Sequence, residues 1–264
     1  MTWWPGSYGH AWSLWESTDG ASTMTTATEF DTQLSEAAPV AFEQIELAGR
    51  RRIGLVVVDE VVGFAAIGGG NLAPPVANAQ VTAMISETDR LARAFSREAR
   101  PILAFLDTHE PGKPEPPYPP HCEAGTGEEN LVPELAWLEA DPNATLIRKD
   151  CINGFVGAIE GDRNSVVDWV NGAELEALLV VGICTDICVM DFVLTMLSAR
   201  NHGLMPSLKD IFVHEGACAT YDLPPTVAKD AGLPREAAHS QFLTHHMGLY
   251  FMASRGARLV NGVA

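Results

Sequence analysis

Two cysteines four residues apart give this 264-residue chain its clearest chemical signal. Cys184 and Cys188 lie in the stretch Gly-Ile-Cys-Thr-Asp-Ile-Cys, which follows an apolar run at 178–181 and opens a helix-like segment. A thiol between a buried strand and a helix has a fixed position, and the positive end of the helix dipole favours its thiolate form. Cys188 is therefore a candidate nucleophile. A cysteine at such a junction is often just a small buried apolar residue, so the hypothesis depends on partners elsewhere in the chain.

Three ionisable residues stand directly after other short apolar runs: Asp59, Asp107 and Lys149. Taken singly, an aspartate at such a position is more often a helix cap, and a lysine is more often a surface residue. The carboxyl ends of parallel strands, however, meet at one edge of a sheet, where open α/β proteins bind their ligands. The sequence therefore predicts an acid, a cation and a thiol on one rim.

A second group of possible ligands lies in the long, proline-rich loop 107–130. Asp107 and His109 are two residues apart, so both side chains fall on the same side of an extended backbone, and Glu115 and His121 follow. A carboxylate with two imidazoles suits Zn²⁺, and also Mn²⁺ or Fe²⁺, with water completing the coordination shell. The alternative is that these loop histidines are simply solvated. A loop of this length in a compact domain is usually functional or disordered.

Short apolar runs alternate with amphipathic segments along most of the chain. We expect strands at 53–58, 101–106, 144–148, 178–181, 211–213 and 257–260, and helices at 76–100, 131–139, 166–170, 186–202 and 235–253. Such an alternation is typical of βα units. The predicted fold is a three-layer αβα, Rossmann-like arrangement, in which a mainly parallel sheet carries helices on both faces.

The first 38 residues differ in composition from the rest. They are rich in Ser and Thr, show no clear period and hold four of the six tryptophans, which are Trp3, Trp4, Trp12 and Trp15. We expect 1–38 to be a disordered extension and 39–264 to be a single domain. Met24 is an alternative start, and an arm that docks on a neighbouring subunit is the other interpretation.

Charge and cysteine content narrow the function classes. The net charge of −17, from 17 basic and 34 acidic residues, argues against nucleic acid or an anionic membrane as a partner. No apolar run approaches the roughly 18–20 residues of a membrane span, and the first basic residue is Arg50, so a basic signal or transit sequence is not expected. Five cysteines do not pair off into a disulfide framework, which favours reduced thiols in a cytoplasmic compartment.

Six ordered stretches resemble a known family. The chain is similar to the isochorismatase-like cysteine hydrolases, and most of all to plant-type nicotinamidases, over roughly residues 50–262. The matching stretches are Leu-Val-Val-Val-Asp-Glu (55–60), Ala-Phe-Leu-Asp-Thr-His (104–109), Pro-Pro-Tyr-Pro-Pro-His-Cys (116–122), Arg-Lys-Asp-Cys-Ile-Asn-Gly-Phe (148–155), Val-Gly-Ile-Cys-Thr-Asp-Ile-Cys-Val (181–189) and Cys-Ala-Thr-Tyr-Asp-Leu-Pro (218–224).

The resemblance implies the isochorismatase-like hydrolase fold and a reaction. Nicotinamide would be hydrolysed to nicotinate and ammonia through a cysteine thioester, which feeds NAD salvage. Asp59, Lys149 and Cys188 would form the catalytic triad. A cis peptide before Cys184 would aim the backbone N–H groups of Cys184 and Cys188 into an oxyanion hole.

The resemblance also implies a resident divalent metal ion, zinc in the first place and manganese or iron as alternatives. Its ligands would be Asp107, His109 and His121, with Glu115 as a further candidate, and the ion would bind the pyridine nitrogen directly or through water. Phe64 would stack on the substrate ring, although a core position after the first strand explains it equally well. Relatives suggest a homo-oligomer.

The sequence departs from the microbial pattern at two positions. Val61 stands where many microbial members have Gln, and Thr108 stands where Trp is common. These changes put the lining of the substrate pocket in question, but not the triad.

Two rival functions stay open. One is hydrolysis of another small amide or N-carbamoyl amine, whose enzymes share the triad but generally lack the metal ligands. The other is a catalytically silent binding protein on the same fold.

Overall fold

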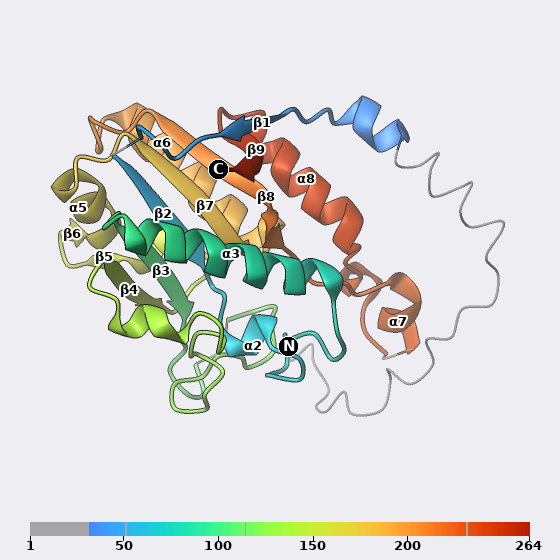
Figure 1. Ribbon diagram of the computed structural model, residues 1–264. Coiled ribbons are helices and arrows are strands. Elements are labelled where there is room, and N and C mark those ends of the chain that lie inside the picture. The colour runs from blue at the N-terminus through green and yellow to red at the C-terminus, as the bar shows by residue number, and fades with distance from the viewer. Residues whose placement is uncertain (1–31, 51, 114, 231) are drawn as a thin grey trace.

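The computed structural model describes residues 32–50, 52–113, 115–230 and 232–264 (Figure 1). The expectations for residues 1–31, namely disorder, a docked arm or a start at Met24, lie outside the described residues. Of the predicted extension, 32–38 are described. Ala38 is buried there, and its carbonyl oxygen lies 2.8 Å from Nε2 of His246.

A single seven-stranded sheet forms the centre of the molecule, and each pair of neighbouring strands is parallel. Its order is β1-β9-β8-β7-β2-β3-β4. The strands are β1 (Phe42–Ile45), β2 (Ile53–Val58), β3 (Ile102–Asp107), β4 (Ala144–Lys149), β7 (Ala177–Ile183), β8 (Asp210–Ala219) and β9 (Arg258–Val263), and a small antiparallel ribbon joins β5 (Ile159–Glu160) to β6 (Arg163–Asn164). The predicted parallel α/β sheet is confirmed.

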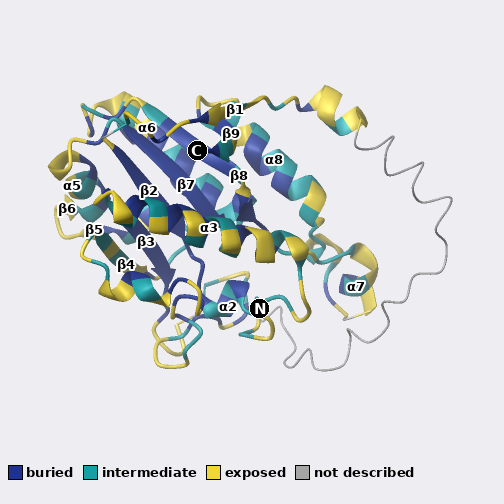
Figure 2. Ribbon diagram, viewed as in Figure 1, coloured by how far each residue is buried: buried dark blue, intermediate teal, exposed yellow. Residues whose placement is uncertain are grey.

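Helices cover both faces of the sheet, as predicted. They are α2 (Val62–Ala65), α3 (Ala79–Arg97), α4 (Gly154–Gly157), α5 (Ser165–Gly172), α6 (Met190–His202), α7 (Pro225–Asp230) and α8 (Gln241–Ala253), with short helical turns η1 (Ala136–Ala140), η2 (Thr185–Val189) and η3 (Arg235–Ala237). In β2, Leu55 and Val57 pack in the same core cluster as α3, whereas Val56 and Val58 pack with α5, α6 and α8. This alternation follows from the two-residue period of a strand. Figure 2 shows the strands as the buried middle layer.

Some predicted elements differ from the structure. The helix expected at 186–202 begins as the π-helical turn η2 and becomes α-helical only at Met190. The helix expected at 235–253 is interrupted, because His239 is extended and its backbone pairs with Leu223. The helix expected at 131–139 shrinks to η1, and strand β1 was not predicted. β1 lies at the sheet edge with only Ile45 fully buried, so its sequence lacks a continuous apolar run.

The sheet order brings four strand ends together, since β7, β2, β3 and β4 are adjacent. Asp107 pairs in register with Lys149, and Val58 pairs with Gly182, just before Asp59 and Cys184. Gly182 has φ +124°, and a Cβ there would overlap the Val58 carbonyl oxygen, so only glycine lets the two strands approach. Among the described residues, no helix is long and apolar enough to cross a membrane.

Candidate active site and metal centre

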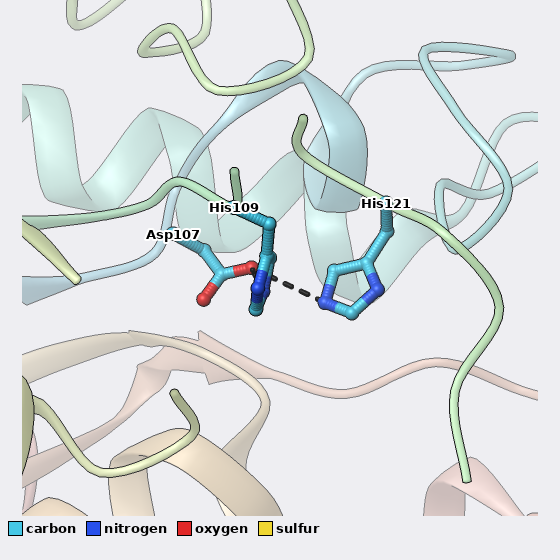
Figure 3. Close-up of side chains that lie close together, drawn as sticks. All are labelled: Asp107, His109 and His121. Carbon is cyan, nitrogen blue, oxygen red and sulfur yellow. Dashed lines mark hydrogen bonds and ion pairs between the residues drawn. The ribbon is translucent and has the colours of Figure 1, made fainter. Parts of the chain in front are cut away.

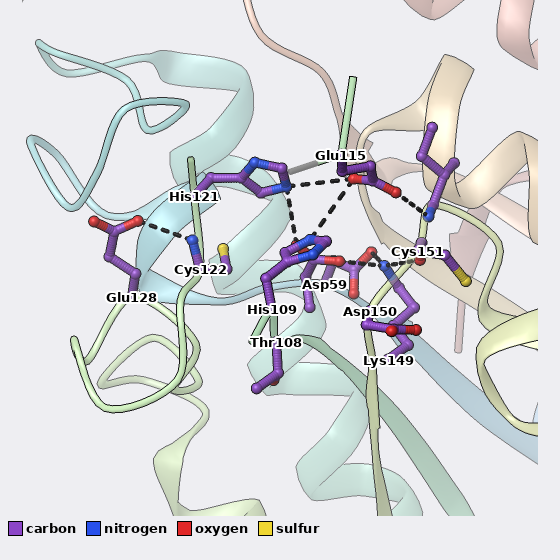
Figure 4. Close-up of polar contacts among 12 residues, drawn as sticks. Asp59, Thr108, His109, Glu115, His121, Cys122, Glu128, Lys149, Asp150 and Cys151 are labelled. Atoms are coloured by element: carbon purple, nitrogen blue, oxygen red, sulfur yellow. Dashed lines mark hydrogen bonds and ion pairs between the residues drawn. The ribbon is translucent and has the colours of Figure 1, made fainter. Parts of the chain in front are cut away.

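A buried lysine joins two carboxylates at the rim. The Lys149 ammonium lies 2.8 Å from Asp59 Oδ2 and 2.8 Å from Asp107 Oδ1, and its side chain is 0% exposed. It also donates a 3.0 Å hydrogen bond to the Cys151 carbonyl (Figure 4). The contact with Asp59 is an ion pair rather than a well-aligned hydrogen bond, and neither Asp59 oxygen accepts such a bond from another described residue. A lone pair of Asp59 therefore remains free to accept a proton.

The ionisation of this pair follows from burial and charge. Burial raises the pKa of Asp59 to about 6, against the opposing effect of the Lys149 charge. Burial by itself would lower the pKa of Lys149, but the charges of Asp59, Cys188 and Asp107 raise it well above its usual value. The pKa of the Asp59 carboxyl is thus closer to neutral pH than usual, and Lys149 stays protonated.

The thiol of Cys188 differs from the sequence-based expectation. Burial raises the pKa of Cys188 well above its usual value and outweighs the attraction of Lys149, the largest opposing charge. The position at a helix start and the nearby cation were expected to favour the thiolate, which is wrong for the resting protein. Desolvation is the larger effect because Cys188 is only 8% exposed. The thiol keeps its proton at rest, and Asp59, whose pKa the Cys188 side chain lowers, is the neighbouring carboxyl group.

The turn η2 carries the nucleophile candidate. The peptide bond between Ile183 and Cys184 is cis, as the resemblance implied. The Cys184 carbonyl accepts hydrogen bonds from the N–H groups of Ile187 and Val189, which flank Cys188. On the outside of the turn, Gly248 of α8 comes so close that a Cβ would lie 2.9 Å from Asp186 Cα. The turn is therefore held by its own backbone hydrogen bonds and by close packing against Gly248 of α8.

Three side chains next to Lys149 converge as a metal centre would require. Asp107, His109 and His121 are buried, and one ligand atom of each lies within 4.8 Å of the others (Figure 3). Asp107 Oδ2 is 3.0 Å from His109 Nε2 and 3.3 Å from His121 Nε2. His121 Nδ1 lies 2.7 Å from the Pro119 carbonyl, which can only accept, so that nitrogen carries the proton and Nε2 is free to bind a cation. The donor set fits a divalent ion.

Glu115 completes this cluster. Its Oε2 lies 3.6 Å from His109 Nε2 and 3.5 Å from His121 Nε2, while Oε1 accepts a 3.0 Å hydrogen bond from the Ile152 N–H (Figure 4). The structure thus brings all four predicted ligand residues to one point, with the loop 107–121 folded back on itself.

Phe64 lies beside the cluster of candidate metal ligands formed by Asp107, His109 and His121. Its ring centroid is 5.5 Å from that of His121, and the ring also lines a cavity of about 550 Å³. The cavity walls include Ile183 and Tyr221 next to Cys184, but neither the buried triad nor the metal cluster lines it. Phe64 therefore lies next to both this cavity and the three candidate metal ligands, and its stacking on a substrate ring stays a prediction.

Several polar residues near the nucleophile were missed by sequence reasoning. Tyr118 and Tyr221 lie close enough to Cys184 for its charge to raise their pKa values, after the larger effect of burial. His239, for which the sequence showed no partner, pairs with Asp186 at 2.8 Å. Tyr221 belongs to the family-like stretch at 218–224, and Asp186 belongs to the one at 181–189. Only their positions in those motifs could have indicated a role.

Comparisons with known proteins agree with this geometry. The isochorismatase domain family matches residues 54–240. Nicotinamidase 1 of Arabidopsis thaliana is 51% identical over 239 residues, which are 90% of this chain and 97% of that protein. The crystal structure of a nicotinamidase from Bacillus subtilis has a TM-score of 0.58 at 22% identity and covers 79% of this chain and 99% of its own. A pyrazinamidase from Pyrococcus horikoshii, solved in complex with zinc, has a TM-score of 0.54 at 19% identity, over 80% and 99%. At such identities these two structures show the shared fold.

Proposed function

The chain belongs to the isochorismatase family, and from this premise we propose that it hydrolyses nicotinamide to nicotinate and ammonia. Nicotinate is a precursor of NAD, so the reaction feeds NAD salvage. One observation carries the proposal: Lys149 joins Asp59, the base beside Cys188, to Asp107 of the histidine cluster. The Lys149 cation thus connects the proposed thiol nucleophile with the histidine cluster that would orient the substrate ring. The chain is also 51% identical to a nicotinamidase.

The first half of the reaction forms a thioester. Asp59 takes the proton of the Cys188 thiol as the sulfur attacks the carboxamide carbon, and the N–H groups of Cys184 and Cys188 receive the oxyanion. Lys149 offsets the negative charge that moves between Asp59 and the sulfur. The carbon–nitrogen bond then breaks, Asp59 returns its proton to the leaving nitrogen, and ammonia departs.

The second half releases nicotinate. A water molecule replaces ammonia, Asp59 takes one of its protons, and the resulting hydroxide attacks the thioester carbon. The same two backbone N–H groups receive the second oxyanion. The carbon–sulfur bond breaks, and Cys188 regains its proton from Asp59. Atoms and charges balance as amide plus water giving acid plus ammonia.

We propose zinc as the resident metal ion, held by Asp107, His109 and His121 with Glu115 at the open side. One carboxylate with two imidazoles suits zinc, and a structural relative was solved with it. When bound, the ion would orient the substrate through its ring nitrogen, with Phe64 against the ring. A homo-oligomeric state and a cytoplasmic location are further proposals; the absence of disulfides among Cys122, Cys151, Cys184, Cys188 and Cys218 fits a reducing compartment.

Metal removal tests the proposal most directly. We expect an ammonia-release assay with nicotinamide to lose activity with a chelator, and His109→Ala to bind less than stoichiometric metal and to turn over about 10²-fold slower, because orientation is lost. His202→Ala, at an exposed position on α6, is the control. Metal content is measured by elemental analysis. Metal-free protein with full nicotinamide turnover, or faster ammonia release from an N-carbamoyl amine, would contradict the proposal.

The acid side of the pH profile reports on Asp59. Burial raises the pKa of Asp59 to about 6, and only its deprotonated form can accept the thiol proton. We therefore expect kcat/KM to fall about tenfold per pH unit below this pKa and to level off above it. Initial rates of ammonia release from about pH 4 to pH 8 check this. A profile that stays flat down to pH 4 would remove Asp59 from the role of base.

A further inference from the structure

Beyond the triad, we infer that His239 is a positioning residue for the nucleophile: as a cation, it holds the η2 turn in place through Asp186. The inference rests on the proposed function, because it assigns His239 a part in that reaction. Asp186 lies two residues before Cys188, within the same turn. His239 lies in the short segment between η3 and α8.

Two contacts fix the Asp186 carboxylate. Its Oδ2 lies 2.8 Å from His239 Nε2, and its Oδ1 accepts a 2.6 Å hydrogen bond from the Thr220 hydroxyl. The Asp186 side chain is 15% exposed and that of His239 is 11% exposed, so water screens this pair poorly. Both Asp186 oxygens are thereby engaged, and the start of η2 cannot rotate without breaking one of these bonds.

The surroundings of His239 define its charge state. Nε2 faces the carboxylate, and Nδ1 lies 2.8 Å from the Tyr221 carbonyl oxygen, so both ring nitrogens face atoms that only accept. A histidine satisfies two acceptors only when both nitrogens carry protons. The ring also stacks on Tyr221, with centroids 3.8 Å apart and planes 13° apart, an arrangement that suits a cation over an aromatic face.

The backbone of His239 pairs with a neighbouring loop at Leu223, while its side chain contacts the turn η2. Its N–H and carbonyl exchange hydrogen bonds of 2.8 and 2.7 Å with Leu223, which closes the base of the segment that contains α7. That segment contributes Val227 and Leu233 to the wall of the 550 Å³ cavity beside Ile183. His239 therefore links the nucleophile turn to the wall of this cavity.

A charge at this position matters because the reaction builds negative charge on Cys188 and on the oxyanion. An unpaired Asp186 carboxylate two residues away would oppose that charge, and the His239 cation offsets it. The other titratable groups here are Tyr221 against the ring, Cys184 beside Asp186, and His245 of α8, whose pKa burial lowers to about 4 against the opposing charge of Asp186. The Thr244 hydroxyl of α8 lies 3.5 Å from Nδ1 and carries no charge.

The test compares His239→Gln with wild type, with exposed His202→Gln as the matched control. Two rates are measured: ammonia release from nicotinamide, and alkylation of Cys188 by iodoacetamide, followed by peptide mass spectrometry. We expect His239→Gln to lower kcat and the alkylation rate about tenfold, with little change in KM.

A second variant separates charge from shape. In Asp186→Asn/His239→Gln no unpaired carboxylate remains, so we expect the double variant to recover most of the lost rate. A double variant no better than His239→Gln, or a KM that rises as much as kcat falls, would overturn the inference. The alkylation rate does not depend on the substrate. If wild type releases no ammonia from nicotinamide while alkylation follows the expected pattern, the proposed function fails and the positioning role stands.

Discussion

Replacing Cys188 with alanine is expected to lower ammonia release from nicotinamide by about 10⁴-fold or more, because the variant cannot form the thioester. Losing the nucleophile of a catalytic unit removes nearly everything that the unit contributes, while substrate binding is retained. We therefore expect Cys188→Ala to bind nicotinamide with an affinity close to that of wild type in calorimetry, since neither Phe64 nor the metal cluster is changed. The rate is measured as initial ammonia release at saturating substrate.

Cys218→Ala is the matched control, since Cys218 is also a buried free thiol but lies on β8, outside the turn η2. We expect this control to keep its activity and to lose only a little stability. Ammonia release by Cys188→Ala at more than about one hundredth of the wild-type rate would exclude Cys188 as the nucleophile. Circular dichroism shows whether each variant is folded.

Replacing Lys149 with methionine is expected to reduce both stability and activity. Methionine fills the same space but leaves Asp59 and Asp107 facing each other without a cation in a site with 0% exposure. Removing one member of a buried charge cluster costs about 3–5 kcal/mol, which lowers Tm by roughly 6–20 °C in a chain of this size. Activity should fall about 10³-fold, because nothing offsets the charge that passes between Asp59 and the sulfur.

The control for this variant is Lys209→Met. Lys209 also pairs with a carboxylate, at 2.9 Å from Glu176, but its side chain is 68% exposed, so water screens the pair. We expect thermal unfolding and turnover of this control to match wild type. If Lys149→Met unfolded at the wild-type Tm and kept its turnover, the central place of Lys149 in the site would be wrong.

Local chain chemistry made the fold and much of the site predictable. The strand 53–58 was predicted to the residue, because six consecutive apolar positions in a chain rich in short runs have few alternatives to a buried parallel strand. Asp59, Asp107 and Lys149 could be placed on one rim from their positions alone, because the carboxyl ends of parallel strands share an edge. The family-like motifs supplied what spacing could not, namely the cis peptide before Cys184.

Other features depend on residues far apart in the sequence and were beyond prediction. The interrupted helix at 235–253 is one of them, because helical periodicity cannot reveal that the backbone of His239 pairs with that of Leu223. The His239–Asp186 pair is another: it joins positions 53 residues apart, and nothing in the sequence around Asp186 points to His239.

Residue type and local periodicity are enough to show which groups are present and at which strand ends they stand. The chemistry of these groups depends on the packed structure. Burial holds the proton on Cys188 where a helix start and a lysine would have removed it, and burial also brings Asp59 to a pKa of about 6. Both effects depend on how completely the packed chain excludes water, and that exclusion is a property of the whole fold.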